Sequence, residues 1–323
     1  MRVLLLAVVL TALSTCRATP SATRRSRGIP SGGIEAPPPG RSRFLDSSAL
    51  APNDSARAEL ARAFRAAAAR MTTGEFVTPL ASLFAPTGVY INSDPLSSRG
   101  PAAARAWLER DSLNPRSTAR WTIVRHDVSA DGRDGYSYGY LDVIRPNGDT
   151  LPGKYHAYWR RNASGSWQLL AFSRGRRVAG PIAQAAPEWL RDSAGPTRAA
   201  TSDTLMVLRE IMETERAFAN DVGAGVQSAF MKYAAPDGAK MDRGPGYSFG
   251  RTAIGELFAG PAPGPGPFWT PEVGSAAASG DLGFTTGPVS ARRPGEGPSP
   301  PPGAKYFTIW RRMPGGEWRY VID

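Results

Sequence analysis

The chain has 323 residues, of which 41% are hydrophobic and 21% charged, a composition that is typical of globular proteins and excludes a largely disordered one. The net charge of +11 would suit nucleic acid, but residues 202–323 hold 12 basic and 13 acidic residues, and no basic helix or ribonucleoprotein motif occurs. We therefore expect no nucleic-acid partner. With one cysteine and two histidines, the sequence also predicts no metal site and no cofactor.

Residues 1–16 are typical of an export signal. Arg2 precedes an apolar run, Val3–Leu13, that is too short to cross a bilayer but has the length of a signal-peptide core. The run ends in Leu-Ser-Thr-Cys, which resembles a bacterial lipobox and implies that Cys16 is lipidated. The alternative is simple secretion with cleavage near Ala18. We expect an exported protein anchored in the bacterial cell envelope by a lipid on Cys16 or, in the alternative, a soluble periplasmic or secreted one.

Two segments lack hydrophobic periodicity. Residues 17–52 are rich in Pro, Gly, Ser and Arg, and this composition predicts a disordered spacer after the anchor. Residues 179–201 are shorter and predict a linker between two domains.

Residues 53–178 predict a first domain in which helices precede strands. Apolar residues at helical spacing over 54–71 predict an amphipathic helix. A short helix near 76–84, a brief strand near 89–92 and a third helix that begins with Gly100-Pro101 follow. Alternating segments then predict an antiparallel meander of four strands, at 118–128, 133–145, 151–161 and 166–173.

The second domain, residues 202–323, repeats the first. Trp121-Thr122 recurs 148 positions later as Trp269-Thr270, and so does the pattern of Gly135 to Gly139, as Gly283 to Gly287. Three further elements recur after 151 positions: Lys154-Tyr155 as Lys305-Tyr306, Trp159 as Trp310, and Trp167 as Trp318. Six of the eight tryptophans therefore form three matched pairs, which indicates two diverged copies of one unit.

The element order and these repeated motifs resemble the nuclear transport factor 2-like superfamily, in its SnoaL-like and ketosteroid-isomerase-like branches. The resemblance covers about residues 54–177 and 203–323. It implies an α+β fold with two tandem cone-shaped domains, each with about three N-terminal helices packed on a curved, mainly antiparallel sheet. It also implies an apolar pocket in each cone. Function does not follow from it, because the superfamily includes isomerases, dehydratases and plain binding modules.

The strand around His156 offers the first candidate site. Alternation places His156 and Tyr158 on one face of the strand and their neighbours on the other. The equivalent positions in the second copy are Phe307 and Ile309, so this face is polar in one copy and apolar in the other. We predict that these four residues line ligand pockets. His156 is a candidate general base; the alternative is a structural imidazole.

Asp242 is the second candidate base. The ketosteroid-isomerase-like branch places a catalytic Asp about eight residues before the Gly that opens the third helix; counting back from Gly250 gives Asp242. The same count from Gly100 gives Asn92, with Asp94 two residues on. The tyrosine that such isomerases present from the first helix has no counterpart here. The alternative is a solvated loop carboxylate.

The sequence therefore predicts a non-catalytic, envelope-anchored protein that binds a small apolar molecule or acts as a scaffold. The two copies are expected to pair with each other as an internal pseudo-dimer, or the chain to form a homodimer. The alternative is an isomerase- or dehydratase-like enzyme that uses one cone pocket with Asp242 or His156 as general base.

Overall fold

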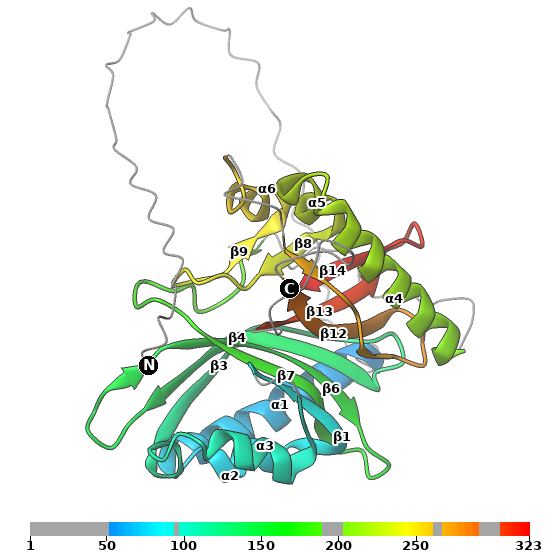
Figure 1. Cartoon of the computed structure of the whole chain (residues 1–323). Coiled ribbons are helices and arrows are strands. Elements are labelled where there is room, and N and C mark those ends of the chain that lie inside the picture. Colours follow the sequence, from blue (N-terminus) through cyan, green and yellow to red (C-terminus); the bar gives the residue numbers. More distant parts are fainter. Residues whose placement is uncertain (1–51, 94–96, 189–202, 261–266, 291–303) are drawn as a thin grey trace, which may run out of the picture. The chain divides into compact units, whose positions relative to one another are not determined.

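The computed structural model describes residues 52–93, 97–188, 203–260, 267–290 and 304–323 (Figure 1). The predicted export signal with Cys16, almost all of the predicted spacer, Asp94, and most of the predicted linker lie outside these ranges. None of the helices in them is long and apolar enough to span a membrane.

In the first domain, two helices precede the first strand and a third lies between the second and third strands, as the sequence predicted. The helices are α1 (Pro52–Thr73), α2 (Val77–Ser82) and α3 (Gly100–Leu108), with a 3-10 turn η1 (Asn114–Arg116). The strands are β1 (Phe84–Ile91), β2 (Ser98–Arg99), β3 (Thr118–Val128), β4 (Asp134–Ile144), β5 (Thr150–Leu151), β6 (Gly153–Arg161) and β7 (Trp167–Arg176). The sheet order is β2-β1-β7-β6-β4-β3, and only the pairing of β1 with β7 is parallel.

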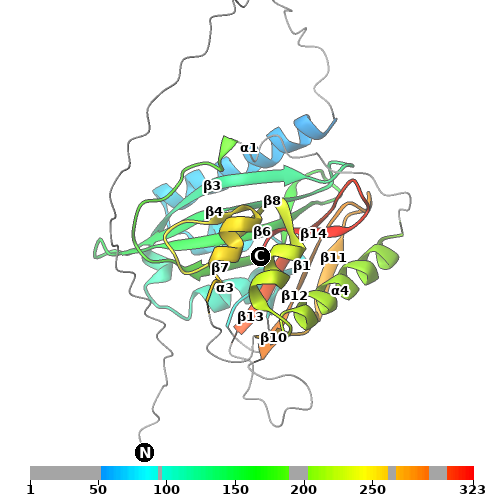
Figure 2. The ribbon, with the colours of Figure 1, turned by 90° about the horizontal axis from the view of Figure 1, so that it is seen from above.

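The second domain repeats this topology. Its helices are α4 (Thr204–Asp221), α5 (Val226–Tyr233) and α6 (Gly250–Glu256). Its strands are β8 (Ala234–Lys240), β9 (Ser248–Phe249), β10 (Phe268–Trp269), β11 (Val273–Ala276), β12 (Leu282–Ser290), β13 (Ala304–Arg312) and β14 (Trp318–Ile322), in the order β10-β12-β13-β14-β8-β9. Both sheets are mainly antiparallel, and α4 lies over β11 and β12 (Figure 2). The predicted α+β fold class is confirmed.

One difference between the copies has a local cause. In the first domain β3 runs unbroken over eleven residues, whereas its counterpart is divided into β10 and β11. The interruption includes Pro271, which has no N–H to donate to a strand ladder.

The repeated glycines have a steric reason. A Cβ atom added at Gly139 would overlap the carbonyl oxygen of Thr122, and one at Gly287 would overlap that of Thr270. At the preceding glycines, Gly135 and Gly283, the obstacle includes a side chain of the first helix of each copy. The strands therefore need glycine where they approach a neighbouring backbone and where a helix packs closely.

Each helix-covered sheet face forms its own core. In the first domain Leu60, Phe64 and Met71 of α1 pack with Trp121, Trp159 and other inward-facing residues. In the second domain Ile211 and Phe218 of α4 pack with Trp269, Trp310 and Tyr320. The tryptophans of the repeat are thus shared packing elements.

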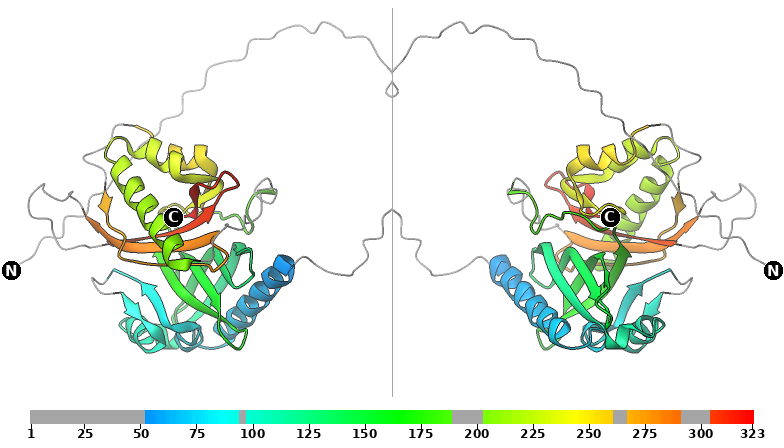
Figure 3. Two further views of the ribbon diagram at one scale, coloured as in Figure 1. Left: turned by 90° about the vertical axis from the view of Figure 1, so that its right-hand side faces the viewer. Right: turned by 90° about the vertical axis from the view of Figure 1, so that its left-hand side faces the viewer.

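A third core joins the two domains, which lie in one compact unit. The sheet faces opposite to the helices pack against each other (Figure 3). Tyr136, Tyr138 and Tyr140 of β4 contribute from the first domain, and Phe284 and Ile309 from the second. Burying both apolar faces in this way stabilises the association of the two copies.

Candidate functional site

The four residues predicted to line pockets all lie between the two sheets. His156 and Phe307 stack on each other, with ring centroids 4.3 Å apart and planes inclined by 20°. Tyr158 donates a hydrogen bond from its hydroxyl to Asp134 Oδ2 at 2.7 Å, and Ile309 is fully buried. The helices cover the other face of these strands, which carries the tryptophans. A ligand-binding role of the four residues stays a prediction.

His156 is poorly suited to act as a base. Its Nε2 lies 2.9 Å from the carbonyl oxygen of Phe307, so Nε2–H donates and the ring is neutral. Burial among apolar groups lowers the pKa of His156 to about 3, since the charged form would lose its solvation. Nδ1 is buried and has no hydrogen-bond partner among the described residues.

Asp242 forms an ion pair that crosses between the domains. Lys154 Nζ, which is fully buried, donates to Asp242 Oδ1 at 3.0 Å and also to the carbonyl of Gly246. The carboxylate also accepts from the backbone N–H of Gly244 at 2.6 Å and from the Ser248 hydroxyl at 3.1 Å. All of these contacts hold the carboxylate in place. Asp242 thus acts as a partner for a buried amine, and its role as a base stays untested.

A cavity of about 720 Å³ lies in the first domain between the helices and the sheet, and we call it the first-cone pocket. Its apolar lining comes from the residue before α2, from β1, β4 and β5, and from α3: Phe76, Tyr90, Trp107, Leu108, Val143 and Leu151. Its polar lining consists of Ser93, Arg110, Asp111, Ser112, Asn114, Arg174 and Arg176. A volume in this range is typical of small-molecule sites, and the lining of this pocket is divided between apolar and polar residues.

Arg174 is one of the polar residues that line this pocket. It is on β7, two residues beyond the buried Phe172, and therefore points to the helix-covered face. Its Nε donates to the carbonyl of Leu141 at 2.9 Å and its Nη2 to that of Leu151 at 2.8 Å. These bonds fix the guanidinium but do not neutralise it. Within the described ranges Arg174 forms no ion pair, and burial lowers its pKa because the charge is poorly solvated.

Tyr90 accompanies Arg174 in the same pocket. The tyrosine belongs to β1, the strand that pairs with β7, and its ring packs against Phe172. Burial raises the pKa of the Tyr90 hydroxyl, which stays protonated and can donate a hydrogen bond. A guanidinium and a phenol therefore line the same cavity.

The pocket rim is also basic. The Arg110 guanidinium lies over the Trp107 ring at 4.5 Å from its centroid, and Arg176 lines the same rim. The single carboxylate of the lining, Asp111, forms an ion pair with Arg145 at 2.5 Å. The described lining residues thus include three arginines, Arg110, Arg174 and Arg176, and one carboxylate.

The second cone contains a buried acid that sequence reasoning did not single out as a functional residue. Glu215 of α4 is fully buried and accepts hydrogen bonds from the Trp310 indole at 3.0 Å, the Trp269 indole and the Thr285 hydroxyl. Burial raises its pKa to about 7. In the first domain Phe64 occupies the equivalent place. The sequence signal that could have identified Glu215 is the position of a glutamate on the apolar face of an amphipathic helix.

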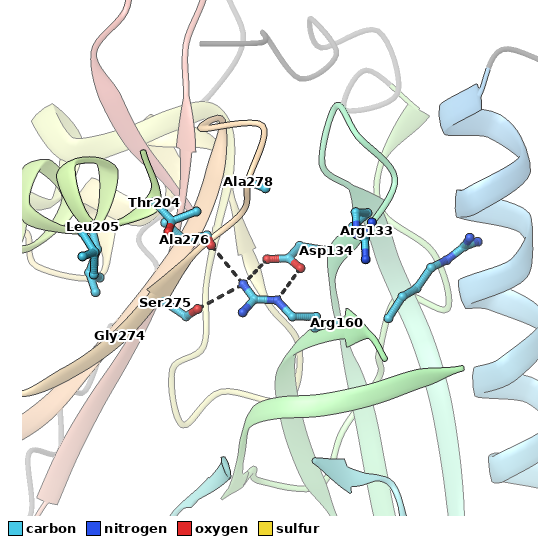
Figure 4. A pocket seen from close by; sticks show the side chains of 11 residues that line it. Arg133, Asp134, Arg160, Thr204, Leu205, Gly274, Ser275, Ala276 and Ala278 are labelled. Carbon is cyan, nitrogen blue, oxygen red and sulfur yellow. Dashed lines mark hydrogen bonds and ion pairs between the residues drawn. The ribbon is translucent and has the colours of Figure 1, made fainter. Parts of the chain in front are cut away.

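A shallower cavity of about 440 Å³ lies where the β4–β6 end of the first domain meets α4 and β11 of the second (Figure 4). Arg160 spans it, with an ion pair to Asp134 and hydrogen bonds from Nη2 to the Ser275 hydroxyl and the Ala276 carbonyl at 3.0 Å each. Arg160 therefore links the two domains at this cavity.

No cluster of three or more His, Cys, Asp or Glu residues suited to a metal ion occurs in the part of the chain that the structure describes.

Comparison with known proteins gives matches among solved structures alone. No family model and no curated protein matches the chain. Among solved structures, a protein from Catenulispora acidiphila in complex with S-DNPA is 15% identical over 38% of this chain and 94% of its own, with a TM-score of 0.31. An ntf2-like protein with a cystatin-like fold from Novosphingobium aromaticivorans is 16% identical over 37% and 80%, with a TM-score of 0.30. ActVI-ORFA from Streptomyces coelicolor is 16% identical over 37% and 95%, also with 0.30.

Each of these matches spans one copy of the repeat, and at such identities and scores none of them bears on activity. Both halves of the chain have the same helices, the same strand order and the same single parallel pairing. The two halves of the chain are therefore two α+β domains of one topology.

Proposed function

We propose that the chain is a non-catalytic binding protein whose first domain holds a small amphiphilic anion in the first-cone pocket. The second domain serves as a built-in partner that covers the outer face of the first sheet. The observation that carries this proposal is Arg174, a guanidinium that forms no ion pair with any described residue and lines a cavity of about 720 Å³ with both polar and apolar walls. A buried charge of this kind is costly unless an opposite charge reaches it, and a ligand carboxylate would supply that charge.

The geometry favours binding over catalysis. General base catalysis requires a titratable group within hydrogen-bond distance of the reacting proton. The two candidate bases, Asp242 and His156, are not among the residues that line the first-cone pocket, and both are held by contacts between the domains. Asp111 lines the pocket, but it is paired with Arg145.

The proposal is tested by calorimetric titration of the purified chain with decanoate and with decanol. We expect decanoate to bind at least about tenfold more tightly, since a charge-assisted hydrogen bond contributes about 1.5–3 kcal/mol. Arg174→Met should remove this preference. Arg133→Met is the matched control, because it removes the same charge from an exposed position outside the pocket. Equal affinities for acid and alcohol, or a preference that survives Arg174→Met, would refute the proposal.

We further propose that the protein works at the outer side of a bacterial membrane, tethered by a lipid on Cys16. The support is the sequence pattern at residues 1–16. A single acyl-type anchor needs a second signal for stable attachment, and the basic residues that follow Cys16 would provide one.

A further inference from the structure

Tyr90 of β1 lines the first-cone pocket and has a hydroxyl that no described residue engages. The residue is 6% exposed, and its hydroxyl forms no hydrogen bond within the described ranges. Its ring is fixed by Phe172, at 5.6 Å between centroids, and by Phe84, at 6.0 Å. A buried tyrosine hydroxyl usually has a hydrogen-bond partner. Since Tyr90 lines the cavity, a molecule bound in the cavity is the partner available to this hydroxyl.

The register of the sheet places Tyr90 beside Arg174. The strands β1 and β7 pair in parallel, with Tyr90 opposite Phe172. Arg174 follows two residues later on β7 and therefore faces the same side of the sheet as Phe172. Diagonal neighbours on one sheet face are within reach of each other when their side chains are long. The pKa of Tyr90 reflects this proximity, because burial raises it and the charge of Arg174 lowers it to a smaller extent.

Both side chains offer hydrogen-bond donors in fixed positions. Arg174 uses Nε and Nη2 for the carbonyls of Leu141 and Leu151, whereas its Nη1 has no hydrogen-bond partner among the described residues. A guanidinium donates only, and the protonated hydroxyl of Tyr90 can also donate. The two donors differ in charge, because the guanidinium is a cation and the phenol is neutral. The matching ligand therefore has a carboxylate and, close to it, a neutral acceptor oxygen.

A 2-oxo acid has this arrangement, since its carbonyl carbon is bonded directly to the carboxylate carbon. We propose, as a step that rests on the proposed function, that Tyr90 is a specificity-determining residue and selects 2-oxo acids with an apolar tail. Arg174 binds the carboxylate, and the Tyr90 hydroxyl donates to the 2-oxo oxygen. The tail lies against the apolar part of the first-cone pocket.

The test is calorimetric titration of the full chain with 2-oxodecanoate and with decanoate, which lacks the 2-oxo group. We expect the wild type to bind 2-oxodecanoate about tenfold more tightly, because one additional hydrogen bond forms. Tyr90→Phe keeps the ring that packs against Phe172 and loses the donor. This variant should bind both acids with equal affinity, and it should bind decanoate as tightly as the wild type does.

Tyr155→Phe is the matched control. It removes the same group from the same core, but Tyr155 does not line the pocket, so the tenfold preference should remain. The role of Tyr90 is overturned if Tyr90→Phe keeps the preference, or if this variant weakens the binding of both acids alike, as a purely structural role would.

Two results in the wild type separate this role from the proposed function. Decanoate binding that depends on Arg174, without a preference for 2-oxodecanoate, overturns the role of Tyr90 alone. A chain that binds neither acid overturns the proposed function together with it.

Discussion

His156 and Phe307 occupy equivalent positions of the two copies, and their rings stack on each other with centroids 4.3 Å apart. Two equivalent residues meet in this way when copies pack about a local two-fold axis. The neighbouring contacts have the same character: Lys154 of the first copy bonds to Asp242 of the second, and Lys305, its equivalent, bonds to the carbonyl of Asn92 in the first. Equivalent residues of the two copies therefore make equivalent contacts across the inter-sheet core.

This position of Phe307 predicts a strong effect of substitution. Phe307→Asp places a carboxylate between the sheets, where it is poorly solvated, and should lower the free energy of unfolding by at least about 3 kcal/mol. Leu205→Asp is the matched control, since Leu205 is 71% exposed and the change should cost less than about 0.5 kcal/mol. Urea unfolding at pH 7 measures both. Similar effects of the two substitutions would show that residue 307 is not in a packed core.

The buried acid of the second cone predicts a pH dependence. The pKa of Glu215 is raised from 4.5 to about 7 in the folded chain, so the folded state retains a proton that the unfolded state releases. Its contribution to stability is complete below pH 4.5 and is lost as the pH rises to about 7. Glu215→Gln should therefore gain about 3 kcal/mol relative to the wild type between pH 4.5 and 7.5. A stability difference that does not change with pH would contradict the assignment.

His156 predicts a pH dependence of stability opposite to that of Glu215. The pKa of His156 is lowered from 6.5 to about 3 in the folded chain. Between these two pH values the unfolded state binds a proton at His156 and the folded state does not. This contribution is complete above pH 6.5 and is lost as the pH falls. His156→Phe has no imidazole to protonate in the unfolded state, so its stability lacks this pH dependence. The wild type should therefore become less stable relative to the variant as the pH falls from 6.5 to 4.5. Thermal unfolding over this range distinguishes the two residues, because the trends run in opposite directions.

The shared inter-sheet core bears on the expectation that residues 53–178 and 202–323 are separate domains. Each half has its own helix-covered core. The sheet face that carries Tyr136, Tyr138 and Tyr140 would be exposed to solvent in the isolated first half, because the second half buries it. We expect the two fragments, when mixed, to form a one-to-one complex, and each alone to associate with itself. Light scattering coupled to size-exclusion chromatography measures this. Two fragments that stay monomeric and do not bind each other would contradict it.

The anchor is tested by Cys16→Ser, because Cys16 is the only cysteine of the chain. The variant should leave the membrane fraction of the producing cells, while the wild type stays in it. A wild type found in the soluble fraction would favour simple secretion.

The sequence predicted much of the fold because hydrophobic periodicity and the repeat are local signals. The predicted strand 118–128 matches β3, and the repeat correctly implied equal topologies. Alternation separated His156 and Tyr158 from their neighbours, but it cannot tell which face the helices cover, since both faces are buried here. Which face the helices cover depends on tertiary packing.

The residues that line the first-cone pocket could not be predicted from the sequence for a related reason. Arg174 stands among other arginines at the end of β7, and nothing in the sequence distinguishes it from an exposed one. Its significance comes from the carbonyls of Leu141 and Leu151, which lie distant in sequence and hold it inside the cavity. Glu215 did carry a signal, because a charged residue on an apolar helix face is rarely buried without partners.

The central claim is that Arg174 receives the anionic end of a ligand in the first-cone pocket, and a crystal structure of the chain with decanoate tests it most directly. We predict a carboxylate within about 3 Å of the Arg174 guanidinium, with the alkyl chain against Trp107, Leu108 and Val143. A first-cone pocket without decanoate, or decanoate bound with its carboxylate away from Arg174, would contradict the account.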